Sequence, residues 1–353
     1  MDKFVKKLKP LCKNEFLKKW WLVILLSIIL AGGVLVFLRG DEDEWTKNKY
    51  GIWVKHGNPS SAAPDGAKTA ETWKRDKTML MGETTSSDTH KISDNLYRMF
   101  VNGKGGISYA ESTDGKNWGS LANTGVTEDE NMMISNPSAL KLADGSWIML
   151  YEQTSKTQPG QQKGPNGKSN QRNLYLATSA DGITFAKQGI AIDSSKSDNF
   201  FASVPDMVLM PNNDVRLYYV CGGNAICSSI SKDSGKTWVK EPGFRMANMA
   251  VDPDVVKQTV DGKTSWVMYY SVLEPSENNL FKAISTDGYL WTKLSGQVIK
   301  KTGENAIVDP DVFETTPGSW VMNFGESGGN SSTGGDQINL YRATFEGDIF
   351  AEK

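Results

Sequence analysis

One acidic motif occurs twice in the chain. The stretch VDPDVV at residues 251–256 returns as VDPDVF at residues 308–313, so each copy places a carboxylate on both sides of a proline. Aspartate and proline are poor strand formers, and strand propensity therefore does not explain the repeat. Two carboxylates with separated pKa values can break a glycosidic bond, because one donates a proton to the leaving oxygen while the other activates water or attacks the sugar.

Three further segments align with these two motifs. They are NPSA at 136–139, VPDM at 204–207 and the weaker SDTH at 87–90. If all five segments start equivalent units of a repeat, their polar side chains meet at one opening, where like charges repel unless a cation, a proton or a substrate compensates them. The candidate catalytic residues are then Asp88, Asp206, Asp252 and Asp309, and the candidate substrate-binding residues include Asn136, Asp254 and Asp311.

A structural role is the alternative for each of these aspartates. An aspartate at a strand start can accept hydrogen bonds from nearby backbone N–H groups, and a proline can stiffen the entry to the strand. Repetition favours this interpretation, since a catalytic residue needs to occur only once. For any single aspartate, both roles stay open at the level of sequence.

A repeated turn identifies the elements that hold these residues. Four segments share the order Ser, Asp, Gly and an aromatic residue, and a fifth, TFEGDIF at 344–350, is degraded. The four are STDGKNW (112–118), SADGITF (179–185), SKDSGKTW (231–238) and STDGYLW (285–291). The aspartate can accept backbone N–H bonds within such a turn, and the glycine adopts the conformation that the turn requires. This turn, the Asp box, resembles the one found in sialidases and related propellers.

Each Asp box lies between predicted β-strands. A strand–turn–strand hairpin and a third strand, rich in aromatic and β-branched residues, precede each box, and a fourth strand follows it. Five such units of four strands predict an all-β fold, a five-bladed β-propeller. The fourth strand of the last unit is short, and the stretch WVKHGNP at 53–59 is predicted to complete it.

The predicted topology places the acidic motifs at one end of the propeller. The first strand of each blade lines the central channel, so these motifs are expected at the channel mouth. The loops between second and third strands open on the same face, and two of them, at 154–171 and 327–337, are long and polar, as expected of a binding rim. This face also holds Glu152, Glu274 and Glu326, of which Glu152 and Glu326 are predicted to bind substrate.

The first 48 residues differ from the rest of the chain. Residues 1–19 are rich in lysine, residues 20–38 contain no charge, and residues 39–48 include the acidic run DEDE. At about 1.5 Å per residue, the apolar stretch roughly spans the ~30 Å hydrocarbon core of a bilayer, and the lysines favour a cytoplasmic N-terminus. We therefore expect a single-pass transmembrane signal-anchor at 20–38, an acidic linker, and an extracellular propeller at 49–353. A cleaved signal peptide is the alternative.

The overall composition restricts the partners. The chain is 39% hydrophobic and 23% charged, with a formal net charge of −2, which gives no support for nucleic-acid binding and leaves sugar-like partners open. Cys221 and Cys227 flank a hairpin-like turn and are candidates either for a disulfide or for two buried free thiols. Neither histidine, His56 or His90, lies near them in sequence, so a zinc site is not expected.

The predicted fold and the acid–proline blade starts together resemble the five-bladed glycosidases of glycoside hydrolase families 43 and 32. The resemblance spans roughly residues 50–353. It implies that carboxylates at the channel mouth act as base, acid and pKa-tuning group, with Asp88, Asp252 and Asp309 at matching positions. The family's acid usually stands in a Glu-x-Pro blade start, which this chain lacks, so a glutamate from a loop would have to replace it.

Three functions follow as hypotheses. The first is hydrolysis of glycosidic bonds by a membrane-anchored extracellular propeller that requires no cofactor. The second is a non-catalytic surface module that binds glycan or protein through the same face. The third, a sialidase-like enzyme, rests on the Asp boxes, although the chain lacks an Arg-Ile-Pro motif. A Ca²⁺ ion in the ring of aspartates would be structural, since calcium prefers oxygen ligands.

Overall fold

The computed structural model describes residues 71–156, 171–273, 279–301, 306–327 and 338–351, and the backbone of two short strands earlier in the sequence. These strands, β1 (Glu44–Lys47) and β2 (Trp53–His56), form a two-stranded sheet. Among the described residues, no helix is long and apolar enough to cross a membrane. The predicted anchor at 20–38 lies outside them.

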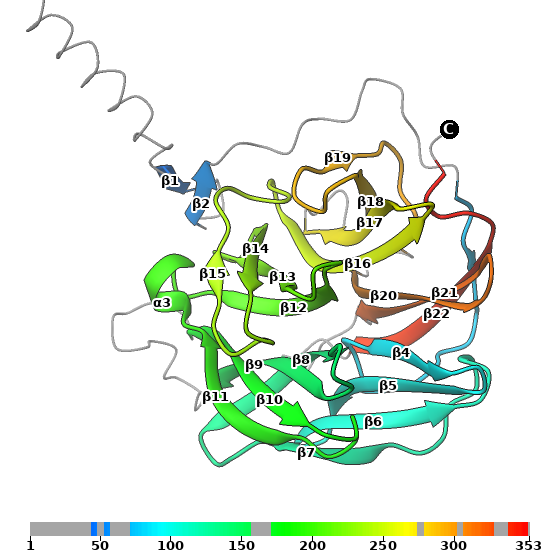
Figure 1. Ribbon diagram of the computed structural model, residues 1–353, viewed down its shortest axis with the longest axis horizontal. Coiled ribbons are helices and arrows are strands. Elements are labelled where there is room, and N and C mark those ends of the chain that lie inside the picture. Colours follow the sequence, from blue (N-terminus) through cyan, green and yellow to red (C-terminus); the bar gives the residue numbers. More distant parts are fainter. Residues whose placement is uncertain are drawn as a thin grey trace, which may run out of the picture. The chain divides into compact units, whose positions relative to one another are not determined.

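Five four-stranded antiparallel sheets follow, and each is one blade (Figure 1). The first blade contains β4 (Asp88–Ser93), β5 (Leu96–Gly103), β6 (Gly106–Ser112) and β7 (Ala122–Thr127). The second contains β8 (Met132–Lys141), β9 (Trp147–Ser155), β10 (Arg172–Ser179) and β11 (Ala186–Ile192), and a short helix, α3 (Ser194–Ser197), follows it. The third contains β12 (Ala202–Leu209), β13 (Val215–Cys221), β14 (Ala225–Ser231) and β15 (Val239–Lys240).

The fourth blade contains β16 (Ala250–Val260), β17 (Lys263–Val272), β18 (Leu280–Ser285) and β19 (Thr292–Lys293). The fifth contains β20 (Ile307–Thr316), β21 (Ser319–Ser327), β22 (Ile338–Glu346) and β3 (Lys74–Arg75). The first strands β4, β8, β12, β16 and β20 pack against one another around the centre, and each sheet runs outward from there (Figure 1). This is the predicted five-bladed β-propeller.

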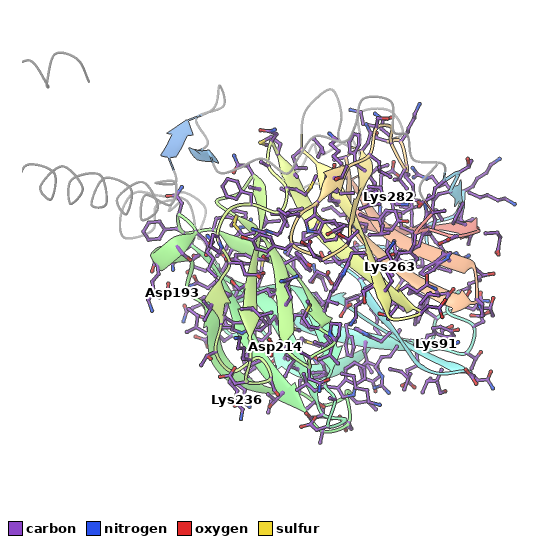
Figure 2. All side chains as sticks on the ribbon, turned by 45° about the horizontal axis from the view of Figure 1, so that its top comes forward. Lys91, Asp193, Asp214, Lys236, Lys263 and Lys282 are labelled. Atoms are coloured by element: carbon purple, nitrogen blue, oxygen red, sulfur yellow. A yellow bond between two sulfur atoms is a disulfide. The ribbon has the colours of Figure 1, made fainter. Side chains whose placement is uncertain are left out.

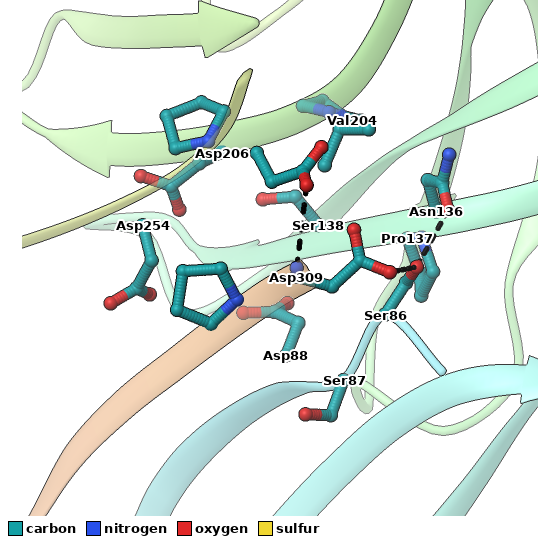
Figure 3. A pocket seen from close by; sticks show the side chains of 14 residues that line it. Ser86, Ser87, Asp88, Asn136, Pro137, Ser138, Val204, Asp206, Asp254 and Asp309 are labelled. Atoms are coloured by element: carbon teal, nitrogen blue, oxygen red, sulfur yellow. Dashed lines mark hydrogen bonds between the residues drawn. The ribbon is translucent and has the colours of Figure 1, made fainter. Parts of the chain in front are cut away.

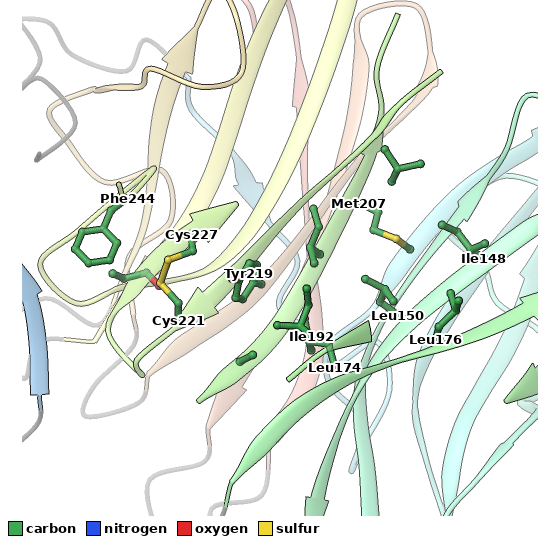
Figure 4. Packing of buried hydrophobic residues seen from close by; sticks show 14 of the residues in the cluster. Ile148, Leu150, Leu174, Leu176, Ile192, Met207, Tyr219, Cys221, Cys227 and Phe244 are labelled. Carbon is green, nitrogen blue, oxygen red and sulfur yellow. A yellow bond between two sulfur atoms is a disulfide. The ribbon is translucent and has the colours of Figure 1, made fainter. Parts of the chain in front are cut away.

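Apolar side chains fill the space between neighbouring blades. Between the second and third blades, for example, Ile148, Leu150 and Leu176 belong to the same buried cluster as Met207 and Tyr219 (Figure 4). The aromatic and branched residues that marked the strands in the sequence therefore form the core of the propeller. Burial of this apolar surface is the main force that holds the blades together.

The ring closes with a strand from the N-terminal side of the chain, because β3 pairs with β22 and completes the fifth blade. The prediction that residues 53–59 provide this strand is wrong, since residues 53–56 pair with β1 instead. Core packing explains why β3 takes this place. Trp73, directly before β3, packs against Tyr269 and Phe345, with ring centroids 5.9 Å and 5.5 Å away.

A buried ion pair reinforces this closure. The Lys282 side chain of β18, labelled in Figure 2, is 2% exposed. It pairs with Glu71, which precedes β3. Glu71 also accepts hydrogen bonds from the Tyr269 hydroxyl at 2.9 Å and from Trp73 Nε1 at 2.8 Å. Lys282 Nζ donates to the carbonyl oxygen of Ile349 at 2.5 Å. The cluster therefore joins both ends of the propeller chain to the fourth blade.

The Asp boxes form turns on the face opposite the starts of the first strands. In the first box, Asp114 Oδ1 accepts backbone N–H bonds from Lys116 at 2.8 Å and from Asn117 at 2.7 Å, as predicted. The boxes also bind arginines of neighbouring blades through their carbonyl oxygens. These bonds run from Arg98 to Gly182 (3.0 Å), from Arg216 to Asp287 (3.0 Å) and from Arg342 to Lys116 (2.5 Å). The boxes thus hold adjacent blades together.

Cys221 and Cys227 form a disulfide across the β13–β14 hairpin, with their Cα atoms 5.8 Å apart (Figure 4). Both cysteines are buried in the cluster that also contains Phe244. Because this hairpin joins the second and third strands of its blade, the disulfide restrains the third blade on the face where the channel opens.

Candidate active site at the channel mouth

The residues after the blade-start prolines, and Asp88 at the matching place in the first blade, form a closed ring of contacts. Each side chain accepts a hydrogen bond from the backbone N–H that follows the equivalent residue in the next blade. The pairs are Ala139 N to Asp88 (2.5 Å), Met207 N to Ser138 (3.0 Å), Val255 N to Asp206 (2.9 Å), Val312 N to Asp254 (3.2 Å) and Thr89 N to Asp311 (3.0 Å). We call these five acceptors the latch ring.

The latch ring gives four of the predicted site residues a structural task. Asp88, Asp206, Asp254 and Asp311 each link one first strand to the next, which is the role that repetition favoured. Ser138 makes the same contact without a charge, so the contact needs an acceptor but not a carboxylate. Asp88, Asp206 and Asp254 also line the pocket at the channel mouth, whereas Asp311 is 3% exposed and does not.

Burial and mutual repulsion raise the pKa values of ring carboxylates. Burial is the largest cause for Asp206, Asp254 and Asp311, and the negative charge of neighbouring ring members adds to it. One histidine lies close to this charge, with Nε2 of His90 3.0 Å from Oδ2 of Asp88. Burial lowers the pKa of His90, but the nearby aspartates, Asp88 first, raise it above its ordinary value.

His90 is a site residue that the sequence patterns did not indicate. It lies two residues after Asp88 on β4, so both side chains point to the same side of the strand. Its ring packs edge-on against Trp147, with centroids 5.4 Å apart. The spacing is the signal that could have identified it, because the second residue after Asp88 lies on the same side of the strand as Asp88.

The residues before the four blade-start prolines, and Ser86 at the matching place in the first blade, have an unusual backbone conformation. Ser86, Asn136, Val204, Asp252 and Asp309 occupy this position in the five blades, and all have positive φ, between 44° and 52°. Positive φ is uncommon outside glycine and most strained for a β-branched residue such as valine. In the second to fifth blades, the pairing of the first two strands shifts register at this point, as in a β-bulge. The bulge directs these side chains, called the mouth residues below, into the channel mouth (Figure 3).

The mouth residues, with the prolines and part of the latch ring, line a small pocket that opens to solvent at the channel mouth. Its two mouth carboxylates come from neighbouring blades, and the N–H of Asp309 points to Oδ2 of Asp252 at 3.5 Å (Figure 3). Burial, followed by the charge of Asp309, raises the pKa of Asp252 to about 8. Burial also raises the pKa of Asp309, against the effect of hydrogen bonds from Thr85 and Ser86. The pocket thus holds two carboxylates in different environments.

Hydroxyl groups from the segment before β4 hold Asp309. Its Oδ2 atom lies 2.6 Å from Oγ1 of Thr85 and 2.7 Å from Oγ of Ser86. The same Ser86 oxygen lies 2.7 Å from Oδ1 of Asn136 (Figure 3). Asp309, Ser86 and Asn136 therefore form one hydrogen-bonded row across the fifth, first and second blades.

Glu152 and Glu326, the two rim glutamates predicted to bind substrate, do not line the pocket. Glu152, with its side chain 1% exposed, pairs with Arg172 at 2.9 Å, and Glu326, 4% exposed, pairs with Arg75. Arg172 also covers the ring of Phe201, with 4.9 Å from Cζ to the ring centroid. Glu152 reaches the pocket only through Asn136, which donates to it. Glu274 and most of both long loops lie outside the described residues.

One group of three side chains in the described part of the chain brings metal-ligand atoms within 4.8 Å of one another: Asp198, Cys221 and Cys227. The two sulfur atoms are joined in the disulfide, so they are not thiolate ligands. Among the described residues, the aspartates of the latch ring and of the channel mouth do not form such a group.

No protein-family model matches the chain, and no curated protein matches it in sequence. Solved structures do match. A thermostable family-43 glycoside hydrolase superposes with a TM-score of 0.55 and 14% identity, over 79% of this chain and 98% of that one. In structure, the chain resembles the family-43 glycoside hydrolases.

Two further matches show how far this likeness extends. An endo-arabinase from Bacteroides thetaiotaomicron has a TM-score of 0.51 and 10% identity, over 77% of this chain and 96% of that one. An N-acetylgalactosamine deacetylase from F. plautii, solved with blood group B trisaccharide, has a TM-score of 0.52 and 12% identity, over 80% and 95%. Identities this low establish the shared fold. The deacetylase shows that structures of this fold include more than one chemistry.

Proposed function

We propose that this protein acts on carbohydrate at the channel mouth and hydrolyses glycosidic bonds with Asp252 and Asp309. The observation that carries the proposal is this pair, because the buried carboxylate of Asp252 and the half-buried carboxylate of Asp309 come from adjacent blades and share one pocket in environments that differ. Pairs of titratable groups whose surroundings push their pKa values apart are the usual basis of acid–base catalysis. The structural likeness to family-43 glycoside hydrolases supports the same substrate class.

In the proposed reaction Asp252 is the acid. Its raised pKa, about 8, keeps the proton in place at neutral pH. It donates this proton to the glycosidic oxygen while the bond from that oxygen to the anomeric carbon breaks. Asp309 is the base, and it removes a proton from the water molecule whose oxygen bonds to the anomeric carbon. One water is consumed, and the proton on Asp309 returns to Asp252 through solvent after the products leave.

The remaining predicted site residues have other tasks in this proposal. Glu152 and Glu326 are buried against arginines, so Asp252 takes the acid role that the family resemblance assigned to a glutamate. Asn136 stays at the mouth, where it can contact substrate. Asp88, Asp206, Asp254 and Asp311 hold the first strands in place through the latch ring.

Non-catalytic glycan binding is the second candidate function. A specific observation favours it, namely that every other described carboxylate of the predicted site is engaged in a latch contact or an arginine pair. A protonated Asp252, with Ser86 and Asn136, would then offer hydrogen-bond donors and acceptors to sugar hydroxyls. Sialidase activity has no comparable support, because the Asp boxes that suggested it lie on the opposite face and join blades.

Release of reducing sugar by the full-length protein in mild detergent tests the proposal. The substrates are arabinan, xylan, galactan, fructan and sialosides, and the variants are Asp252→Asn and Asp309→Asn. Each variant is expected to lose about 10²–10⁴-fold in turnover, the usual contribution of a general acid or base. Asp261→Asn is the matched control, because Asp261 lies on the exposed β16–β17 turn and should leave turnover near wild type. Sugar binding without release, weakened in both site variants, would favour the binding module instead.

We further propose that the propeller lies outside the cell, anchored by residues 20–38 with a cytoplasmic N-terminus. The lysine-rich residues 1–19 favour this orientation, and the Cys221–Cys227 disulfide fits an oxidising compartment. Trypsin added to intact cells should digest the propeller. Protection from trypsin until the membrane is permeabilised would contradict this placement.

No cofactor enters the proposed reaction, and any bound calcium is proposed to stabilise the fold. Melting curves and turnover measured in calcium and in EGTA separate the two roles. A higher melting temperature in calcium at unchanged turnover fits a structural ion, whereas turnover that vanishes in EGTA would contradict the proposal.

A further inference from the structure

The hydroxyl of Ser86 has one hydrogen and two neighbours that can accept it. Its Oγ atom lies 2.7 Å from Oδ2 of Asp309 on one side and 2.7 Å from Oδ1 of Asn136 on the other. A serine hydroxyl donates one hydrogen bond at a time, although its oxygen can accept others. Both contacts therefore contain a hydrogen only when one of the two neighbours supplies a second one.

Asn136 does not supply this hydrogen, because its amide nitrogen is held on the side away from Ser86 by a hydrogen bond to Glu152. Nδ2 of Asn136 donates to Oε2 of Glu152 at 3.0 Å, and Ser203 donates to the same oxygen. The other oxygen of Glu152 accepts from Nη1 of Arg172 at 2.9 Å. Turning the amide over would bring its carbonyl oxygen against this arginine-paired carboxylate, which has no hydrogen to offer. The carbonyl oxygen of Asn136 therefore stays directed at Ser86.

Asp309 supplies the hydrogen when it is protonated. If Asp309 is ionised, Ser86 and Thr85 both donate to Oδ2, and the carbonyl of Asn136 faces the Ser86 oxygen with no hydrogen between them. If Oδ2 of Asp309 carries a proton, that proton goes to Ser86 Oγ, Ser86 turns its own hydrogen to Asn136, and Thr85 continues to donate. In this second arrangement every contact contains a hydrogen.

We propose that Ser86 is a hydroxyl switch that follows the protonation of Asp309, and that Asn136 is the positioning residue that makes proton uptake easier. The acceptor that Asn136 presents is unsatisfied while Asp309 is ionised and satisfied once Asp309 is protonated, so it stabilises the protonated form selectively. This inference deepens the proposed function, and its role in turnover rests on it, because proton uptake from water is the step assigned to Asp309.

Other titratable groups face Asp309, and they must be held constant in a test. Asp252 on β16 accepts from its N–H, and Asp88, Asp206 and Asp254 from β4, β12 and β16 line the same pocket. Asp311 follows two residues later on β20, and Glu152 on β9 is connected through Asn136. These groups are the same in wild type and in variants of Ser86 or Asn136, so a comparison of variants isolates the switch.

The test is a pH titration of Asp309 in the full-length protein. The protonation of Asp309 is observed by NMR of ¹³C-labelled aspartate carboxyl groups. The Asp309 signal is assigned by its loss in Asp309→Asn. Asn136→Val removes the acceptor, and Val204, with φ 44° at the equivalent position of the third blade, shows that the fold accommodates a valine at this position. We expect the pKa of Asp309 to fall by about one unit, which corresponds to about 1.4 kcal/mol. Asn136→Gly, which also suits positive φ, provides a second variant without the acceptor.

Two controls make the result specific. Val204→Ala changes an equivalent mouth residue that belongs to another blade, and it should leave the Asp309 titration unchanged. In a Ser86→Gly background, Asn136→Val should add no further shift, because the hydroxyl that connects the two residues is gone. An unchanged or raised pKa of Asp309 in both Asn136 variants, or an equal shift after Val204→Ala, overturns the proposal.

Activity distinguishes this inference from the proposed function. If sugar is released, the acidic limb of the pH–rate profile of kcat/KM should move with the Asp309 titration in Asn136→Val. If no substrate is cleaved but the titration still shifts as expected, the switch is supported and the proposed hydrolysis fails. If sugar is released and the titration does not shift, the switch is refuted while the hydrolase remains.

Discussion

Replacement of Lys282 by methionine tests whether the buried ion pair closes the propeller. The variant keeps a long side chain but removes the ammonium group that pairs with Glu71, at a site where both side chains are at most 3% exposed. Removing one partner of a buried ion pair costs roughly 3–5 kcal/mol, because the other charge is left uncompensated. Tyr269 and Trp73 continue to donate to Glu71, so we expect a loss of about 3 kcal/mol in the free energy of unfolding.

Urea and thermal unfolding, followed by tryptophan fluorescence, measure this loss. With about 2–4 °C for each kcal/mol, Tm should fall by about 6–12 °C. Glu71→Gln combined with Lys282→Met removes both charges and should recover most of the loss. Lys263→Met, on an exposed turn, is the matched control and should stay within about 0.5 kcal/mol of wild type. A loss below about 1 kcal/mol, or a double variant as unstable as the single one, would refute the argument.

Three further predictions concern the channel and the third blade. The free energy of unfolding should decrease as pH rises from about 4 to about 8. Asp252 has a pKa of about 8 in the folded state, against 3.8 ordinarily, so the folded state binds more protons than the unfolded state in this window. Urea unfolding at pH 5 and at pH 8 should show a smaller difference in this free energy for Asp252→Asn than for wild type. Asp254→Ala leaves the N–H of Val312 without its acceptor and should cost about 1–3 kcal/mol, with faster amide exchange at Val312, whereas an equal cost for Asp261→Ala would count against the latch. Replacing Cys221 and Cys227 by serine opens a short loop and should lower stability by about 2 kcal/mol in the same assay, and no change would mean that the disulfide restrains little.

The repeat of the Asp boxes was sufficient to predict the propeller, because each box stands between the third and fourth strands of a blade and its aspartate closes the turn locally. The closing strand could not be predicted in this way. β3 is two residues long, too short to carry an alternating pattern, and its place depends on distant partners. Glu71, beside it, bonds to Tyr269 and Lys282, which lie 198 and 211 residues along the chain.

Alignment of the blade starts predicted which residues meet at the channel mouth but not which task each one has. In DPD both aspartates look alike and both line the pocket, yet Asp254 is a latch acceptor for the N–H of Val312, whereas Asp252 is a mouth residue with positive φ. A positive φ and a register shift cause the difference, and neither is visible in an alternating pattern. The arginine pairs of Glu152 and Glu326 could not be predicted for a similar reason, since the arginines come from other strands.

The two positions of the motif explain why it is repeated and why it varies. The latch position holds a hydrogen-bond acceptor in all five blades, because the ring closes only if every first strand receives one from its neighbour. The mouth position holds serine, asparagine, valine and two aspartates, because the bulge fixes its backbone whatever the side chain is. Side chains at the mouth can therefore differ between blades without loosening the contacts that hold the blades together. An aspartate at the latch is explained by the ring of backbone contacts, whereas Asp252 and Asp309 stand at the position where the side chain varies between blades, and this is why we assign the proposed chemistry to them.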